Sequence, residues 1–149
     1  MTIPYVRPEF RMLPAPTPQS QDYWAGGRDG ELLIHRCHTC QNFFLPGAPV
    51  CWRCRSTDVA PEPVSGRGSV AAFTVNRQTW IPVFPPPYTV ALIELAEQPD
   101  ARVVSNIVDI DPADVTIGLE VEVFFEEWED VWIPLFRPVD VSRPAKESN

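Results

Sequence analysis

Two identically spaced cysteine pairs constrain this chain more than any other feature of its sequence. Cys37 and Cys40 form one Cys-x-x-Cys turn, and after ten further residues Cys51 and Cys54 form another. The chain contains no other cysteine. A Cys-x-x-Cys turn directs two thiolates toward one centre, so two facing turns supply the tetrahedral sulfur shell that Zn²⁺ prefers. The spacing therefore predicts a zinc-binding ribbon with these four cysteines as its ligands.

Other uses of four cysteines fit this sequence less well. Disulfides suit small secreted domains, and the N-terminus is not expected to be a signal peptide. A redox-active pair would lie in a βαβ pattern, which the surrounding sequence lacks. Iron in a rubredoxin-like site uses the same ligands and stays open beside zinc. Because four thiolates close the coordination shell, the predicted role is structural, with His38 an exposed turn residue rather than a ligand.

Composition limits the remaining classes. The 149 residues can bury one core and a small satellite module, and the 18 prolines argue against long helices. No apolar run approaches the roughly 20 residues needed to cross a membrane. A net charge of −8 argues against nucleic-acid binding, because neutralising phosphates needs a basic surface. We expect a reduced, cytoplasmic protein without a membrane or nucleic-acid partner.

The chain before the cysteines divides into an arm and a short helix. Residues 1–18 hold five prolines and predict an extended arm, which either frays or lies against a surface. Ser20 as the cap and Asp22 in the first turn predict a short helix that ends at Gly26 and Gly27. The adjacent aromatic residues of this helix either both pack inward, or one of them faces a groove or a partner.

The predicted ribbon is a hairpin around the first cysteine turn. Residues 31–36 lead into the turn and residues 41–45 lead out of it. The ribbon is expected to end near residues 56–58, where Pro61 and Pro63 mark a linker. The predicted organisation is an arm at 1–18, helix and ribbon at 19–60, a barrel at 61–139 and a flexible tail at 140–149.

From Val64 onward the pattern indicates β-structure. Strands are expected at 70–75, 88–95, 102–108, 120–125 and 133–138, with a bend or bulge from Gly66 and Gly68 in the first. A helical turn capped by Asp111 separates the third strand from the fourth. Five short strands in this order fit a closed barrel of the oligonucleotide/oligosaccharide-binding (OB) type. The predicted fold is thus mainly β: a short helix, a rubredoxin-like zinc ribbon and a five-stranded OB barrel.

This order of segments resembles a known family of acyl-CoA-associated proteins, which join N-terminal helices, a rubredoxin-like zinc ribbon and a C-terminal OB-fold. The resemblance covers about residues 19 to 138. It is carried by Tyr23-Trp24-Ala25-Gly26, the run from Asp29 to Cys37, Cys40, Cys51-Trp52-Arg53-Cys54-Arg55-Ser56, Val64-Ser65-Gly66-Arg67-Gly68 and Ile117-Gly118-Leu119-Glu120-Val121. The sequence departs from the family at Trp52, where members more often carry proline, and in its longer proline-rich arm.

The resemblance implies a non-catalytic accessory role in lipid or steroid metabolism. Family members assemble with thiolase-like condensing or retro-aldol enzymes, or with hotdog-fold hydratases. They are thought to hold or channel acyl-CoA and in some cases to make the partner active. For this chain the resemblance implies a hetero-oligomer that contains such an enzyme and an acyl-CoA.

The residue types that such a role requires are present. Binding CoA calls for a few arginines near an aromatic or apolar groove. The candidates are Tyr23, Trp24, Arg28, Arg36, Arg53, Arg55 and Arg67. The arginines that flank the cysteines would equally offset the negative charge of a zinc tetrathiolate. For docking on the partner we expect the apolar arm and the loop at 80–87, with Phe10, Trp80 and Phe84 as contact residues.

Two other functions fit the sequence less well. A single-stranded nucleic-acid-binding module is compatible with the architecture but not with the charge or the lack of basic–aromatic alternation. An enzyme would need a nucleophile near a histidine, and both His35 and His38 lie at the ribbon. The acids from Glu126 to Asp130 are expected in a solvated loop. The sequence therefore favours an acyl-CoA-binding accessory subunit.

Overall fold

Helices occupy little of residues 2–140, which are the residues that the computed structural model describes. Helix α1 (Gln21–Ala25) continues directly into the 3-10 helix η1 (Gly26–Asp29). This pair ends at Gly30, whose φ of 73° lies in the left-handed region that favours glycine. The expected end of the α-helix at Gly26 and Gly27 is confirmed, since Gly26 is its C-cap, and only the 3-10 turn continues to Asp29. The cap at Ser20 is not of the expected kind, because its side chain makes no capping hydrogen bond to the helix.

The ribbon is a three-stranded sheet in which β1 (Leu32–Cys37) lies between β2 (Phe43–Phe44) and β3 (Val59–Val64). The hairpin of β1 and β2 confirms the predicted one. The linker predicted at Pro61 and Pro63 is wrong, because both prolines lie in β3, which pairs with β1 along its whole length. Prolines are tolerated here because β3 is an edge strand. Pro61 and Pro63 are two residues apart, so both side chains lie on the same face of the strand, and this face is exposed.

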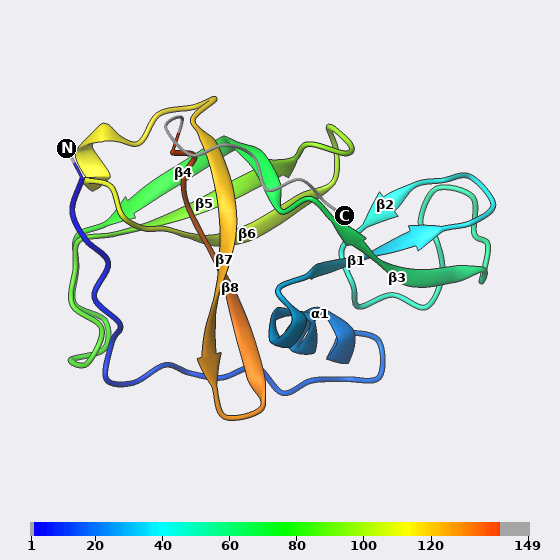
Figure 1. Cartoon of the computed structure of the whole chain (residues 1–149), viewed down its shortest axis with the longest axis horizontal. Helices are drawn as coiled ribbons and strands as arrows, with labels where there is room; N and C mark the ends of the chain where they lie inside the picture. Colours follow the sequence, from blue (N-terminus) through cyan, green and yellow to red (C-terminus); the bar gives the residue numbers. More distant parts are fainter. Residues whose placement is uncertain (1, 141–149) are drawn as a thin grey trace.

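The second half of the chain is a closed barrel (Figure 1). Its strands are β4 (Arg67–Asn76), β5 (Tyr88–Leu95), β6 (Arg102–Ile107), β7 (Glu120–Trp128) and β8 (Val131–Pro138). They close in the order β4-β5-β6-β8-β7, with β6 and β8 parallel, and the 3-10 turn η2 (Pro112–Asp114) follows β6. The capping role of Asp111 is confirmed, since its side chain accepts a hydrogen bond from the Ala113 amide. The predicted fold class is confirmed.

A bulge bends β4, as predicted, but the glycines do not form it. The register with β5 shifts between Val70 and Ala72. Gly66 has another task just before the strand, where its φ is 75° and an added Cβ would lie 2.3 Å from the Cγ1 atom of Val123. Only glycine allows the chain to enter the barrel this close to β7.

The main hydrophobic core fills the barrel and extends into the ribbon. Val70, Ile93, Val103, Val121 and Phe136 are at most 1% exposed inside it. The same cluster includes side chains from α1 and from the first half of β1, namely Tyr23, Leu32 and Ile34. A second, much smaller cluster contains Cys37, Phe44 and Cys51 at the far end of the ribbon. The barrel and the near half of the ribbon thus share one core.

The N-terminal arm runs along the barrel (Figure 1). The Tyr5 amide donates a 2.7 Å hydrogen bond to Asp109, and Arg7 Nη2 donates one of 2.6 Å to the Glu127 carbonyl. Of the two alternatives for the arm, the structure therefore has it lie against a surface, which belongs to its own barrel. The flexible tail predicted at 140–149 lies outside the described residues apart from Asp140. Among residues 2–140, no helix has the length and hydropathy that spanning a membrane requires.

Candidate functional site

The four cysteine sulfurs converge at the far end of the ribbon, all within 4.8 Å of one another. Cys37 Sγ lies 3.5 Å from Cys54 Sγ, and Cys40 Sγ lies 3.7 Å from Cys51 Sγ. A tetrahedral site with metal–sulfur distances of about 2.3 Å has edges of about 3.8 Å. The sulfurs form no disulfide, and their spacing fits one metal ion bound by four thiolates. The predicted ligand set is therefore positioned to hold a metal.

Both cysteine turns use the same backbone geometry. In the first, the Cys37 amide donates to the Asn42 carbonyl and the Gln41 amide donates to the Cys37 carbonyl, at 2.9 and 2.8 Å. In the second, Cys51 pairs with Ser56 and Arg55 pairs with Cys51 at the same two distances. Gln41 and Arg55 have left-handed backbones, with φ of 65° and 63°. Each turn thus folds back after its second cysteine and holds both of its sulfurs on one side.

Backbone amides favour the thiolate form at two of the ligands. Hydrogen bonds from the Cys40 and Thr39 amides hold the pKa of the Cys37 thiol below its ordinary value. Burial raises the pKa of Cys51, but the Cys54 and Arg53 amides outweigh it and lower that pKa to about 6. At Cys54 the Ser56 amide lowers the pKa, whereas burial and the three neighbouring sulfurs raise it to about 12. Four thiolates this close would repel one another, so all four sulfurs can ionise only when a cation binds among them.

A side chain from the barrel supports the cysteine cluster, and nothing in the sequence indicates this role. Asn42 is 1% exposed and directs its Nδ2 atom at Cys51 Sγ, 3.8 Å away. Gln98, in the loop between β5 and β6, donates to Asn42 Oδ1 and to the Phe43 carbonyl at 3.0 and 2.9 Å. Its own Oε1 accepts from the Phe43 amide at 2.8 Å. Gln98 therefore ties the barrel to a residue that contacts a metal ligand.

His38 is a turn residue and not one of the clustered ligands, as predicted. Its ring nitrogens lie 3.1 Å from Asp58 and 3.1 Å from Glu62. Glu62 also accepts a 3.0 Å hydrogen bond from Arg36. Arg36 and then His38 hold the pKa of Glu62 below its usual range. This ion cluster joins β1 to β3 near the cysteines.

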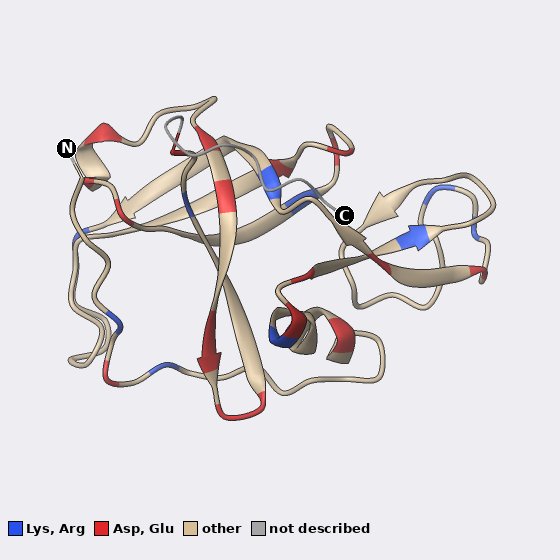
Figure 2. Ribbon diagram, viewed as in Figure 1, with Lys and Arg blue, Asp and Glu red and all other residues tan. Residues whose placement is uncertain are grey.

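The seven candidate CoA-binding residues lie in different surroundings. Tyr23 and Trp24 both pack on the barrel core, with their rings edge to face at 4.8 Å. The guanidinium of Arg28 stacks on Trp132, whereas Arg36 and Arg53 pair with Glu62 and Asp100. Within residues 2–140, Arg28, Arg55 and Arg67 form no ion pair. Figure 2 shows basic residues spread over the arm, the ribbon and the barrel.

The acidic run that was expected as a solvated loop is partly buried. Glu126 lies in β7 and is only 6% exposed, so the prediction is wrong for this residue. Tyr5 Oη donates a 2.6 Å hydrogen bond to Glu126, and Arg11 Nε pairs with it at 3.1 Å. Trp128 Nε1 also donates to the carboxylate. Residues of the arm thus supply two of the three partners that allow this carboxylate to be buried.

The residues predicted to contact a partner differ in exposure. Phe10 on the arm is 47% exposed and Trp80 on the loop before β5 is 69% exposed. Phe84 is only partly exposed, because its ring packs on Tyr88 at 4.7 Å and under Arg11 at 5.5 Å. The contact of Arg11 with Phe84 brings the arm and the loop together. Exposed apolar side chains occur on both segments: Phe10, Met12, Trp80, Ile81 and Val83.

Comparison with known proteins identifies relatives over most of the chain. Residues 61–126 match the family model described as ChsH2, C-terminal OB-fold domain. A DUF35 domain-containing scaffold protein from Methanothermobacter thermautotrophicus is 41% identical over 105 residues, which are 66% of this chain and 77% of that protein. A probable enoyl-CoA hydratase alpha subunit from Thermomonospora curvata is 33% identical over 140 residues, or 93% of this chain. This chain spans only 42% of that hydratase subunit.

A solved structure described as Ltp2-ChsH2(DUF35) aldolase has a similar fold. It superposes with a TM-score of 0.75 at 33% identity, over 85% of this chain and 98% of that one. The relatives named scaffold proteins agree with the predicted non-catalytic role. The ribbon, the OB barrel and these relatives confirm the family that the sequence resembles: the chain belongs to the DUF35 family of scaffold proteins.

Proposed function

We propose that this chain is a non-catalytic accessory subunit that docks on an acyl-CoA-processing enzyme and holds or channels its CoA thioester. The observation that carries the proposal is the similarity to the Ltp2-ChsH2(DUF35) aldolase, which covers 98% of the matched chain at 33% identity. The similarity to a hydratase alpha subunit supports the same class of partner. The partner is accordingly a thiolase-like condensing or retro-aldol enzyme, or an acyl-CoA hydratase.

The metal in this proposal is Zn²⁺, bound by the four clustered cysteines. Zinc accepts a closed tetrahedral shell of thiolates, and the sulfur spacing suits its bond lengths. When bound, it supplies a structural cross-link between the two cysteine turns. Asn42 and Gln98 then orient the site from outside the ligand shell.

Docking is assigned to the exposed apolar side chains of the arm and the loop before β5. Large exposed aromatic residues are the usual anchors of protein interfaces, and truncating such an anchor typically costs about 2 kcal/mol or more of binding free energy. Trp80 and Phe10 are the strongest candidates because of their exposure. Phe84 contributes less directly, since it supports the loop from beneath.

CoA binding is assigned to the surface around α1 and the ribbon. Arg36 and Arg53 already have carboxylate partners, so Arg28, Arg55 and Arg67 are the better candidates for the CoA phosphates. Trp24 is half-buried next to η1, on which Arg28 lies. The expected test is a weaker affinity for CoA in Arg28→Ala, Arg55→Ala and Arg67→Ala. The matched control is Arg102→Ala, which removes an arginine paired with Glu94.

The decisive experiment is co-expression with a thiolase-like or hydratase-like protein encoded beside this chain. Size-exclusion chromatography should show a stable complex, and turnover of acyl-CoA should need both proteins. Trp80→Ala should weaken the complex about 30-fold, which corresponds to about 2 kcal/mol. Val104→Ala, which changes an exposed residue on the barrel, should leave it intact. A chain that binds neither protein nor CoA would refute the proposal.

A further inference from the structure

The proline-rich arm meets the barrel at a regular interval along its own sequence. Three of the residues 4–12 are half-buried, namely Tyr5, Pro8 and Arg11, and the residues between them are exposed. A polyproline II helix has three residues per turn, so residues three apart lie on one side of it. The arm forms no helix or strand in this range and has one bend, at Glu9. The spacing is typical of a proline-rich segment that lies in a groove.

The groove beneath the arm is one face of β7. Phe124, Glu126 and Trp128 alternate along this strand, so their side chains lie on the same face. The ring of Tyr5 packs edge-on against Phe124, with the ring centroids 6.1 Å apart. The guanidinium of Arg7 lies 4.1 Å from the centre of the Trp128 ring. Grooves lined by aromatic residues are the usual binding sites for proline-rich segments, which lose little conformational entropy on binding.

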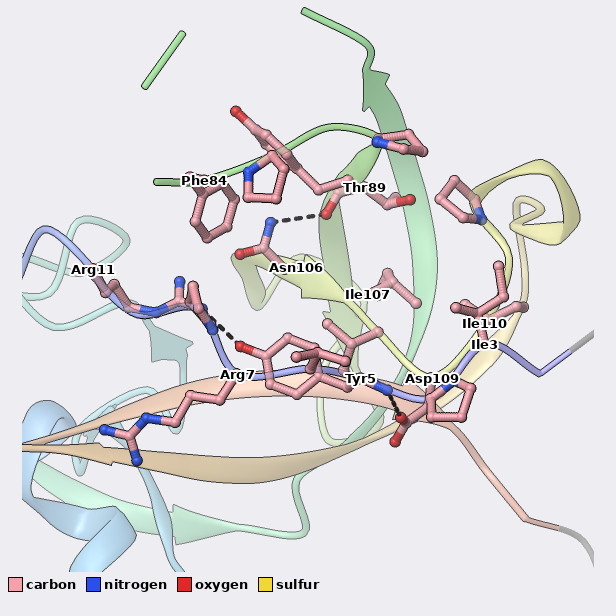
Figure 3. Close-up of a pocket in the computed structure, with 18 of the residues that line it drawn as sticks. Ile3, Tyr5, Arg7, Arg11, Phe84, Thr89, Asn106, Ile107, Asp109 and Ile110 are labelled. Carbon is pink, nitrogen blue, oxygen red and sulfur yellow. Dashed lines mark hydrogen bonds between the residues drawn. The ribbon is translucent and has the colours of Figure 1, made fainter. Parts of the chain in front are cut away.

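The buried carboxylate of Glu126 makes this face of β7 depend on the arm. Tyr5 Oη and Arg11 Nε lie 2.6 and 3.1 Å from the carboxylate. Arg11 also donates a 3.1 Å hydrogen bond to Tyr5 Oη, which Figure 3 shows. Among residues 2–140, Trp128 is the one partner of this carboxylate that does not belong to the arm. Because a buried carboxylate without a cation is costly, an empty face is less stable than an occupied one.

The packing of the arm on its own barrel is incomplete. A cavity of about 620 Å³ lies between the arm, the loop before β5 and the chain that follows β6 (Figure 3). Surfaces that a cavity separates share few van der Waals contacts. The connector between the arm and α1 is exposed at Ala15 and Pro16. After it, the Ser20 amide donates to the Thr17 carbonyl at 3.0 Å, in a turn that precedes α1. The arm can therefore leave its barrel without unfolding α1.

We propose that this face of β7 is a recognition groove for a proline-rich segment, and that the arm of a second copy of this chain occupies it by exchange. In the exchanged dimer, each arm supplies its Tyr5 and Arg11 to Glu126 of the other copy. The contacts are those of the monomer, so the exchange needs no new surface. A tethered segment has an effective concentration of about 1 mM, so the unaltered chain exchanges its arm only near that local concentration. The proposal does not rest on CoA binding or on the partner enzyme.

The first test adds a fluorescein-labelled peptide of residues 2–14 to the full chain and measures fluorescence anisotropy. In the unaltered chain the attached arm competes with the peptide. Substituting Tyr5→Ala and Arg11→Ala together weakens that arm and leaves the groove unchanged, so the peptide should bind at least about tenfold more tightly. A peptide with the same two substitutions should not bind. A peptide with Val6→Ala, at a residue that is 82% exposed, should bind as the original peptide does.

The second test detects exchange between whole chains by reversing the ion pair. Arg11→Glu places two carboxylates in one groove and Glu126→Arg places two guanidiniums there, so neither variant should dock an arm on a copy of itself. In a mixture of the two variants, each arm meets the opposite charge on the other chain. Native mass spectrometry should show the heterodimer in at least about tenfold excess over either homodimer. The matched control carries both substitutions in one chain, which restores the pair within the monomer.

Several outcomes would overturn the proposal. One is a peptide that does not bind the chain with the weakened arm, and another is a substituted peptide that binds as well as the original. A third is a mixture without excess heterodimer although the control with both charge reversals folds. Peptide binding without a heterodimer would assign the groove to a proline-rich segment of another protein and refute the exchange. If the control does not fold, the peptide titration decides.

Discussion

The two ends of the ribbon are stabilised by different means. At the near end, Leu32 and Ile34 of β1 join the large apolar core that fills the barrel. At the far end, the buried residues are two cysteines and Phe44, with Cys40 and Val59 packed beside them. So small a cluster cannot offset the conformational entropy of two ordered turns. One sheet thus passes from a region stabilised by burial to one whose four clustered cysteines are positioned to hold a metal.

This difference predicts how far the structural effect of a substitution in each region should extend. Metal binding at a structural site contributes directly to folding free energy, so losing it should disorder the cysteine turns alone. Loss of core volume should instead weaken the barrel and the near half of the ribbon together. The side chain of Gln98 bridges the two regions and should report on their coupling.

The largest effect is expected from Cys37→Ser. With three thiolates left, the site should lose its metal and the turns around residues 37–56 should lose their fixed structure. Metal analysis and ¹H–¹⁵N NMR should show an empty ribbon beside an intact barrel. Trp52→Ala, which changes an exposed residue between two ligands, should keep its metal. Normal metal content in Cys37→Ser would contradict the assignment of Cys37 as a metal ligand.

Phe136→Ala should be the most damaging substitution in the barrel. The side chain is fully buried in the shared core, so its removal should cost about 3–5 kcal/mol of the free energy of unfolding. Urea denaturation measures this loss, and the metal should remain bound until the barrel unfolds. Val104→Ala on the outer surface should cost less than about 0.5 kcal/mol. Equal costs at the two positions would contradict the assigned core.

Gln98→Ala tests whether the barrel stabilises the cysteine end of the ribbon, because it removes the side chain that connects the two regions. Removing its hydrogen bonds to Asn42 and Phe43 should lower metal affinity by about 10- to 100-fold, as outer-shell changes typically do. Competition with a chelator measures the affinity. Gln78→Ala, in the exposed loop after β4, is the matched control. If affinity were unchanged in Gln98→Ala, the two regions would be independent.

The smallest effect on stability is expected for the docking of the arm on the barrel, which should depend on pH. Burial and the hydrogen bond to Glu126 raise the pKa of Tyr5 from 10.0 to about 12. The neutral phenol therefore stabilises the docked arm fully below about pH 10, and that contribution is lost as the pH rises through about 12. Tyr5→Phe should remove this pH dependence and cost about 1–2 kcal/mol at neutral pH, limited to the arm.

Hydrogen exchange of the arm amides measures the loss in Tyr5→Phe, and absorbance during alkaline titration measures the pKa values. Tyr23 is the internal control, because burial alone raises its pKa to about 12. The variant should therefore lose one of the two late-titrating tyrosines. If both remained, the late titration would not belong to Tyr5.

Local spacing in the sequence was enough to predict the ribbon hairpin, the barrel and the clustering of the four cysteines. The cysteine turns are contiguous motifs, and the alternation of side chains marks each strand by itself. The error at residues 59–64 shows the limit of local rules. Pro61 and Pro63 mark a linker by composition, yet they are tolerated because β3 lies at the edge of the sheet, a position that only strand order defines.

Other features of the molecule depend on contacts between segments that are far apart in the sequence, which local rules do not capture. Glu126 belongs to an acidic run, and its burial depends on Tyr5 and Arg11, which are 121 and 115 residues away. Gln98 supports the metal site from 56 residues beyond Asn42, and nothing in its own surroundings marks it. The five candidate arginines were alike in sequence, and only their neighbours separated those with carboxylate partners from those without.

The sequence by itself determined the set of four cysteines that could hold a metal, the strands of the barrel and the family, because these depend on residue type and short-range spacing. The tertiary structure alone decided that the arm docks on the barrel and that the barrel supports the ribbon through Gln98. The physical reason is that a buried polar group is stable only beside a partner, and the fold selects that partner.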